Sequence, residues 1–229
     1  MEINENTPWF LMLLIAVALG LRHGLDLDHI ATIDAITRTA RKQQSVSRLT
    51  GFFFSFGHGI VVTAISLIIG AGIIQAQVPE WLDGVGAWVS IFFLLAFGFL
   101  NLWNVFQNSS SEMPVGIKSF VTQKIMNKKY NPAMIMIVGA LFAFSFDTFS
   151  QIALFSISAT LMSGWLFSGI LGVCFSLGMI ITDGINGLLV SSIVQRADKG
   201  SLIFSRCLGL AISGLSLGIG FFALFRLFQ

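Results

Sequence analysis

Apolar residues form long runs along this chain, and polar residues gather in the short stretches between them. A membrane-spanning helix needs roughly 20 mostly apolar residues, and six runs meet that length. They are predicted at residues 8–36, 51–75, 84–107, 133–162, 164–194 and 202–228. The first run is apolar as far as Leu21 and then becomes polar while it keeps a helical pattern. Turn-forming or charged residues separate several of the runs, as at 78–80, 131–132 and 198–200.

The composition supports the same fold class. The 229 residues are 55% hydrophobic, and only 10% are charged, whereas an ordinary soluble domain has about a quarter charged residues. This composition excludes a disordered chain, a disulfide scaffold and a nucleic-acid-binding protein, and it argues against a soluble enzyme, because one small core cannot hide so much apolar surface. We expect an all-α polytopic membrane protein with six transmembrane helices in a single domain over residues 1–229.

The charged residues of the loops predict the orientation. Basic residues gather in three loops and at the start of the last span: Arg38, Arg41, Lys42, Arg48, Lys118, Lys124, Lys128, Lys129, Arg196, Lys199 and Arg206. Acidic residues mark the other side: Glu2, Glu5, Glu80 and Asp83. Basic loops remain cytoplasmic, so both termini are predicted to face outside. The first seven residues contain no Lys or Arg, so we expect no cleaved signal peptide before the first span.

The longest predicted cytoplasmic loop covers residues 108–132. Within it, Ile117, Phe120, Val121 and Ile125 recur at three- and four-residue spacing with Lys between them. This pattern fits a surface helix on anionic lipid, and it fits equally a solvated basic loop that only fixes the topology. The loop joins two halves, at about 8–107 and 133–228.

A weak internal repeat relates these halves. A shift of 121 residues places 54–57 (Phe-Ser-Phe-Gly) on 175–178 (Phe-Ser-Leu-Gly), and it places Asp26 on Asp147. Each half then contains three spans, so the second half must insert upside down. This predicts the 3+3 inverted repeat of many secondary transporters, which bind substrate near the midplane where the repeats meet.

Several ionisable residues fall inside the predicted spans. They are Arg22, Asp26, Asp28, Asp34, Asp147 and Asp183, with His23, His29 and His58, and Asp34 is expected near the cytoplasmic edge. A charge at the centre of a membrane helix costs about 2.5–3.5 kcal/mol on insertion scales. These groups must therefore be paired, protonated, hydrated or bound to something, and ionisable residues within a membrane mark a candidate functional site.

The densest group lies at 22–29. On one continuous helix Arg22, His23, Asp26 and His29 fall within an arc of about 120°, whereas Asp28 points nearly opposite unless Gly24 breaks the helix. Imidazole and carboxylate on one face are suited to a transition-metal ion. In the alternative interpretation Arg22 pairs with Asp26 and the histidines only satisfy buried polar groups. Two His and two Asp within seven residues favour the metal site.

Other polar residues are weaker candidates. His58 lies between Gly57 and Gly59, which permit close backbone approach, and we expect it to be a further ligand. Asp183 lies among closely spaced glycines that are also typical of helix packing. Cys174 and Cys207 are isolated within spans, so packing rather than a disulfide is expected.

These motifs resemble those of the nickel/cobalt transporter family. His23 to His29 match its His-x4-Asp-His signature, and three weaker segments follow in the family's order: 54–58, 146–148 and 178–184. The resemblance implies uptake of Ni²⁺ or Co²⁺ across the bacterial cytoplasmic (inner) membrane. It adds Asp147, Thr148, Gln151, Asp183 and Asn186 as candidate substrate or proton-coupling residues.

The chain also departs from the family pattern. It resembles a short branch with six spans, whereas longer members have eight. Gln151 stands where a Glu is frequent, Asn186 stands where a second acid is expected, and Gly184 replaces a Thr. The site therefore carries less negative charge than in typical members. Related branches include exporters, which tend to carry a His-rich loop, and this sequence has none.

The resulting hypothesis is a secondary carrier. His23, Asp26, Asp28 and His29 form the core of the metal site and His58 contributes from the second span, while Arg22 pairs with a carboxylate when the site is empty. Metal entry would displace protons from histidine and make transport depend on pH. The predicted partners are the divalent metal ion and the bilayer. No resident cofactor, nucleic acid or ATPase subunit is expected, and the sequence has no P-loop.

Four rival functions remain. A metal exporter or a proton-coupled carrier of another small solute would use the same acids differently. A membrane metalloenzyme is disfavoured because the sequence has no His-Glu-x-x-His motif and only three histidines, so no enzymatic activity is expected. A sensor or assembly subunit is disfavoured because no soluble signalling domain is evident.

Overall fold

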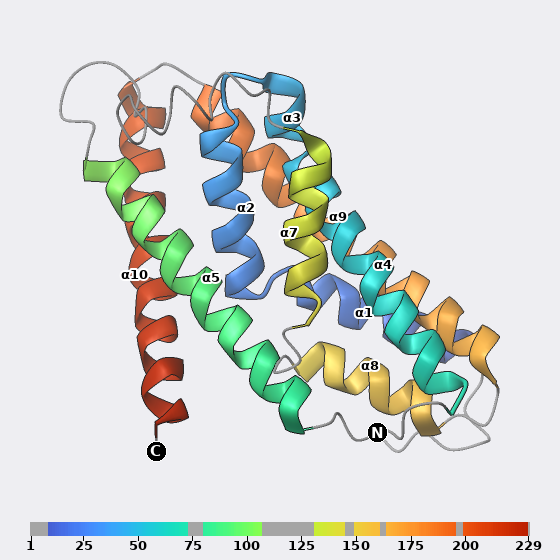
Figure 1. The fold of residues 1–229 in the computed structure, drawn as a ribbon. Helices are drawn as coiled ribbons and strands as arrows, with labels where there is room; N and C mark the ends of the chain where they lie inside the picture. Colours follow the sequence, from blue (N-terminus) through green and yellow to red (C-terminus); the bar gives the residue numbers. More distant parts are fainter. Residues whose placement is uncertain are drawn as a thin grey trace.

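The computed structural model describes residues 9–72, 80–106, 131–144, 149–160, 164–195 and 199–228. Every regular element in these residues is an α-helix (Figure 1). The helices are α1 (Trp9–His23), α2 (Leu27–Thr39), α3 (Gln44–Arg48), α4 (Thr50–Gly70), α5 (Glu80–Phe106), α7 (Pro132–Phe142), α8 (Phe149–Thr160), α9 (Trp165–Gln195) and α10 (Lys199–Leu227). The predicted loop 108–132 lies outside the described residues except for its last two positions, and its candidate surface helix lies wholly outside them.

Long apolar helices confirm a polytopic membrane protein. By length and composition, three helices among the described residues can each cross a bilayer, at Thr50–Gly70, Trp165–Gln195 and Arg206–Leu227. The pair α1 and α2 gives a fourth span if it is counted as one broken helix. Large apolar side chains lie on the outer surface, among them Phe222 at 63% exposure and Leu189 at 59%. A bilayer is the solvent in which such a surface is stable.

The first predicted span, 8–36, is not one continuous helix, and the alternative of a break at Gly24 is the one that the structure has. The chain leaves helical geometry at 24–26, and the axes of α1 and α2 differ by 57°. Arg22, His23, Asp26 and His29 therefore do not share one helix face. The described part of the fourth predicted span likewise holds two helices, α7 and α8, in place of one. The bounds of α4, α5, α9 and α10 follow the other four predicted runs closely.

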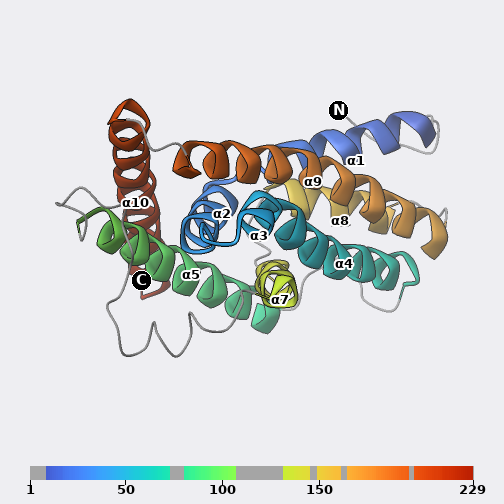
Figure 2. The same cartoon turned by 90° about the horizontal axis from the view of Figure 1, so that it is seen from above.

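The helices α4 and α9 pack along each other at the centre of the bundle, in the most extensive contact of the described residues. Seen from above, α1 lies against α9 and α7 lies against α4, on opposite sides of this pair (Figure 2). The helices α5 and α10 form a second pair, with α2 between the two pairs (Figures 1 and 2). The break between α1 and α2 therefore lies inside the bundle.

Glycine allows these helices to approach closely. A Cβ atom added at Gly178 of α9 would lie 2.2 Å from the carbonyl oxygen of Val17 in α1, and one added at Gly57 of α4 would lie 1.9 Å from the carbonyl oxygen of Met136 in α7. Both distances are far below van der Waals contact. Only glycine at these two positions permits this backbone approach, as is typical of small-residue packing between membrane helices.

Apolar side chains fill the space on both sides of the break. Phe175 and Met179 of α9 pack with residues of α1, α4 and α8 in one buried cluster. Ile33 of α2, Phe54 of α4 and Phe142 of α7 belong to a second buried cluster. Cys174 and Cys207 are free thiols. His23 and His29, which are buried polar residues of the first span, thus lie beside these two apolar clusters.

Candidate metal centre

Three histidines meet at the break in the first span. His23 is the last residue of α1, His29 lies in the first turn of α2, and His58 lies within α4. Their exposed fractions are 1%, 0% and 1%, so all three imidazoles are removed from solvent and lipid. An isolated polar group at such a position is costly unless it is bonded to a partner.

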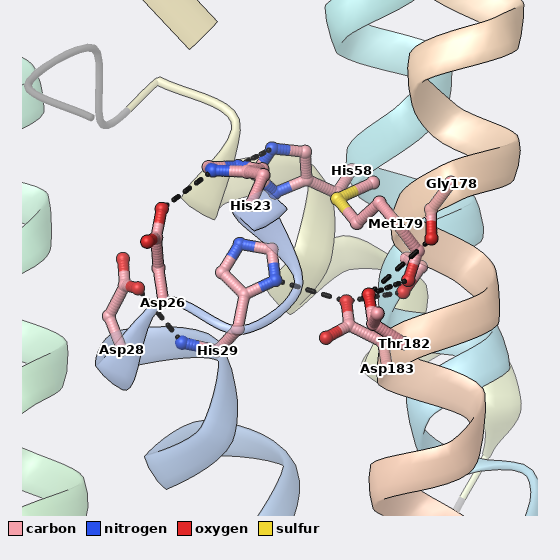
Figure 3. A network of polar contacts seen from close by, with 10 residues as sticks. His23, Asp26, Asp28, His29, His58, Gly178, Met179, Thr182 and Asp183 are labelled. Carbon is pink, nitrogen blue, oxygen red and sulfur yellow. Dashed lines mark hydrogen bonds and ion pairs between the residues drawn. The ribbon is translucent and has the colours of Figure 1, made fainter. Parts of the chain in front are cut away.

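The three imidazoles form a compact group (Figure 3). Nε2 of His23 lies 3.2 Å from Nε2 of His58. The ring centroid of His29 lies 4.6 Å from that of His23 and 4.9 Å from that of His58. One ligand nitrogen from each residue can be chosen so that all three lie within 4.8 Å of one another. The sequence prediction that His58 joins the histidines of the first span in space is consistent with this geometry.

Two carboxylates hold two of these rings in orientation. Nδ1 of His23 donates a hydrogen bond to Oδ2 of Asp26 over 3.0 Å, and Nδ1 of His29 donates to Oδ2 of Asp183 over 3.0 Å. The hydroxyl of Ser55, one turn before His58 on α4, donates to the same Asp183 oxygen over 2.5 Å. Asp183 is fully buried. It therefore connects α9 to α2 and α4 at the histidine cluster.

These bonds fix where the nitrogen lone pairs point. A neutral imidazole has one donor and one acceptor nitrogen, so donation from Nδ1 to a carboxylate leaves the lone pair on Nε2 in His23 and His29. The second shell of a protein metal site has the same arrangement of carboxylate, histidine and metal. At the cluster, Nε2 of His29, Nδ1 of His58 and Oδ1 of Asp183 are buried atoms without a hydrogen-bond partner in the described residues. Buried polar atoms are rarely left without a partner.

The break itself depends on Gly24 and the two aspartates that follow. A Cβ atom added at Gly24 would lie 2.0 Å from the hydroxyl oxygen of Thr182 on α9, so the chain turns at the only residue small enough for this contact. Asp26 then occupies the N-cap position of α2 with an extended backbone. Asp28 accepts a hydrogen bond from the backbone N–H of His29 over 2.9 Å. A negative charge in the first turn stabilises a helix start.

The remaining sequence candidates lie at varied distances from the cluster. Arg22 donates a hydrogen bond from Nη1 to the hydroxyl of Ser150 on α8. Gln151 donates to the carbonyl oxygen of Ala143 over 2.8 Å and so ties α8 to the end of α7. Asn186 lies one turn after Asp183 on α9, and its Nδ2 has no hydrogen-bond partner in the part of the chain described here. Asp147 and Thr148 lie outside the described residues.

Asp34 belongs to a separate polar contact. Its carboxylate is fully buried and accepts a hydrogen bond from Nε of Arg38, one turn later on α2, over 2.8 Å. Sequence reasoning named neither Ser55 nor Ser150 as a contributor to the polar network. The only signal for Ser55 is its position three residues before His58, which puts both on one face of α4.

The geometry suits a transition-metal cation. Imidazole nitrogen binds such ions at about 2.0–2.1 Å, so two nitrogens on adjacent positions of one ion lie roughly 3 Å apart. The Nε2 atoms of His23 and His58 already have this separation. Asp26, Asp28 and Asp183 surround the rings with negative charge (Figure 3). Imidazole favours Ni, Cu, Zn and Fe ions, and the carboxylates compensate the charge of a divalent ion.

Comparison with known proteins shows to which family this chain is similar. The family model NicO, described as a high-affinity nickel-transport protein, matches residues 9–229. The high-affinity nickel-transport protein NixA of Helicobacter pylori is 30% identical over 255 residues, which cover 98% of this chain and 76% of that protein. The nickel transporter NixA of Staphylococcus aureus is 32% identical over 209 residues, covering 79% of this chain and 61% of that one.

A shorter match involves another metal. The cobalt transport protein NhlF of Rhodococcus rhodochrous is 39% identical over 71 residues, or 31% of this chain and 20% of that protein. No solved structure matches the chain significantly.

Proposed function

The chain belongs to the NicO family of high-affinity nickel-transport proteins, and on this basis we propose that it is a secondary transporter that takes up Ni²⁺ or Co²⁺ across the bacterial cytoplasmic membrane. The names of its relatives support both metals, since those relatives are called nickel or cobalt transporters. As a secondary carrier it needs no ATPase subunit and no resident cofactor, and it catalyses no chemical reaction. The metal ion is its substrate.

One observation carries this proposal. Three buried histidines from two membrane spans point their ring nitrogens toward a common region inside an apolar bundle. A structural core would satisfy such nitrogens with hydrogen bonds, yet Nε2 of His29 has no partner in the described residues. A divalent cation bound among the three rings would satisfy it.

The residues take different roles in this site. His23, His29 and His58 supply nitrogen ligands. Asp26 and Asp183 hold two of the rings through Nδ1. Asp28 adds negative charge beside the cluster, and it remains a candidate ligand together with Asp26. Asp147, Thr148, Gln151 and Asn186 remain candidates for substrate contact or coupling on the resemblance alone.

An inverted repeat of three plus three spans is the second part of the proposal. A shift of 121 residues places α1, α2, α4 and α5 on α7, α8, α9 and α10, with bounds that agree within a few residues for most of the pairs. Gly57 and Gly178 correspond under this shift, and so do their contacts, because α4 approaches α7 as α9 approaches α1. Counting α1 with α2, and α7 with α8, as broken spans gives six crossings. Broken helices at the midplane are typical of transporters with such repeats.

We propose that transport proceeds by rocking of one half against the other around the histidine cluster. His23 and His29 belong to the first half, whereas Asp183 belongs to the second. The charges of the loops support an orientation with the α2–α3 end, which carries Arg38, Arg41 and Arg48, in the cytoplasm and both termini outside.

Uptake of labelled Ni²⁺ and Co²⁺ by cells that express the protein tests this function. The wild type is expected to accumulate at least one metal above vector cells, whereas His23→Ala and Asp28→Asn are expected to lose most of that uptake. Cys207→Ala, which changes an exposed residue of α10, is the matched control and should transport normally. Equal membrane levels of the variants are verified by immunoblot.

The outcomes separate the rival functions. Accumulation of neither metal by the wild type would refute uptake and would favour a carrier of another solute. Accumulation below that of vector cells would indicate export. Normal transport by His23→Ala would remove the histidine cluster as the substrate site.

A further inference from the structure

A cavity of about 370 Å³ lies beside the break between α1 and α2. It is bounded by the start of α2, by the first half of α5 and by the last turns of α10. Asp26, Asp28, Ser90 and Ala223 are among the residues that line it. In Figure 1 these parts of the three helices lie in the lower half of the bundle, away from α3.

The walls of this cavity are small or apolar, and among its lining residues only Asp26 and Asp28 are charged. Ala87, Ser90, Ile91 and Leu94 follow the spacing of one helix face on α5. A carboxylate that faces hydrocarbon costs several kcal/mol, so acids in a membrane span face protein or water. The side chain of Asp26 is 23% exposed, and Asp26 lines the cavity. A water-filled cavity would solvate this carboxylate.

The same Asp26 carboxylate connects the cavity to the buried histidines. Its Oδ2 accepts the hydrogen bond from Nδ1 of His23 over 3.0 Å, and the ring of His23 then contacts His58 through Nε2. Asp26 therefore lines the cavity and also contacts the histidine cluster. A cation that enters the cavity meets two carboxylates before it meets the first imidazole.

We infer that this cavity is the vestibule through which the hydrated divalent cation reaches the histidine cluster. The inference rests on the proposed function and names the route of the substrate. In the proposed orientation the vestibule opens to the outside, because it lies at the end of the bundle opposite the basic α2–α3 segment. Its volume is sufficient for an ion with its water shell, since six waters occupy about 180 Å³ at their liquid volume.

The path beyond the cluster is closed in this structure. One turn after His29 on α2, Ile33 packs with Phe54 and Phe142 in a buried apolar cluster. One turn further along α2 lies the ion pair of Asp34 with Arg38. The structure thus has an open approach from the α5–α10 side and a sealed approach from the α3 side, as alternating access requires of an outward-facing carrier.

Thiol labelling in intact cells tests the vestibule. Ser90→Cys places a thiol on its wall with little change in size, and Phe92→Cys places one on the outer face of the same helix, where the native side chain is 64% exposed. Cells are treated with a cationic, membrane-impermeant methanethiosulfonate, and initial Ni²⁺ and Co²⁺ uptake is compared before and after treatment. Modification itself is read from protection against a later mass-tagging maleimide.

We expect Ser90→Cys to be modified and its uptake to fall to near the level of vector cells. Phe92→Cys and the wild type, which has two native cysteines, should keep their uptake because a thiol in lipid does not ionise and react. A Ser90→Cys thiol that stays unmodified, or that is modified without loss of uptake, would overturn the inference. Failure of the proposed function looks different, because the untreated wild type would then accumulate neither metal.

A second pair of variants tests the route without a reagent. Ala223→Trp places a large ring in the vestibule from α10. Phe222→Trp introduces the same side chain at the neighbouring position, on the exposed face of α10, where the native Phe222 is 63% exposed. At equal membrane levels, Ala223→Trp is expected to lose most uptake and Phe222→Trp to keep it. Equal uptake by the two variants would overturn the vestibule.

Discussion

His29 and Asp183 are 154 positions apart in the chain, yet Nδ1 of His29 lies 3.0 Å from Oδ2 of Asp183. Both side chains are fully buried. The contact joins α2 in the first half of the chain to α9 in the second half. It also turns Nε2 of His29 toward His23 and His58, so one hydrogen bond both connects the halves and orients a candidate metal ligand.

Replacement of Asp183 tests this positioning role. Asp183→Asn keeps the shape but removes the charge and offers Nδ1 of His29 an amide in place of a carboxylate. Loss of such a second-shell partner typically lowers metal affinity or activity by about 10–100-fold. We expect the concentration for half-maximal Ni²⁺ or Co²⁺ uptake to rise within this range. Ser192→Ala, on an exposed position of the same helix, should leave it unchanged, and unchanged uptake by Asp183→Asn would contradict the role.

Metal binding to the purified protein tests the histidine cluster apart from transport. In detergent, the wild type is expected to bind Co²⁺, and His58→Ala is expected to bind it much more weakly because one of three imidazole ligands is lost. Cobalt absorption and isothermal titration measure this directly. Cys207→Ala is the control, since this thiol is exposed. Equal affinity of the wild type and His58→Ala would exclude His58 as a ligand.

Helix packing predicts a contrast between two glycines of α9. Gly178→Ala would place a Cβ atom 2.2 Å from the carbonyl oxygen of Val17 and 2.8 Å from the amide nitrogen of Leu21. Both are backbone atoms of α1, so relief needs a shift of the whole helix, and overpacking of this kind costs about 1–3 kcal/mol or more. Gly184→Ala meets nothing within 4 Å and gains helix propensity.

We therefore expect Gly178→Ala to lower the midpoint of thermal aggregation in detergent and Gly184→Ala to keep or raise it. A similar midpoint for both variants would show that α1 and α9 do not pack this closely.

The ion pair of Asp34 with Arg38 predicts that the stability of the protein falls strongly when only one of the two partners is removed. Arg38→Gln leaves a fully buried carboxylate without its cation, and breaking a buried ion pair from one side costs about 3–5 kcal/mol. The double variant Asp34→Asn/Arg38→Gln should recover much of this loss because no buried charge is left. Arg48→Gln is the control, since Arg48 is exposed and contacts Gln195 over only a long 3.4 Å bond. Thermal stability of the four proteins in detergent measures the difference, and equal loss in the single and double variants would contradict the argument.

The sequence alone determined the class of this protein and the residue types of its candidate site. Long apolar runs predicted helices at positions that the structure largely confirms. The length of an apolar run depends only on the local sequence, and this length decides whether a helix can span a bilayer. The cluster at 22–29 and His58 were recognised because ionisable residues are costly inside an apolar bundle and mark a candidate functional site. The order of the motifs identified the family, which the match over residues 9–229 confirms.

Tertiary structure decided how these residues meet. The periodicity of the sequence fitted one helix through residues 22–29 and left a break at Gly24 open. In the structure α9 packs against Gly24 at Thr182 and the chain breaks there. Because of this break His23 and His29 lie in different helices and face His58, and Asp183 reaches His29 from 154 positions away. Local periodicity carries no information on which distant side chain fills the space beside a glycine. That choice depends on packing between whole helices, which exists only once the bundle has formed.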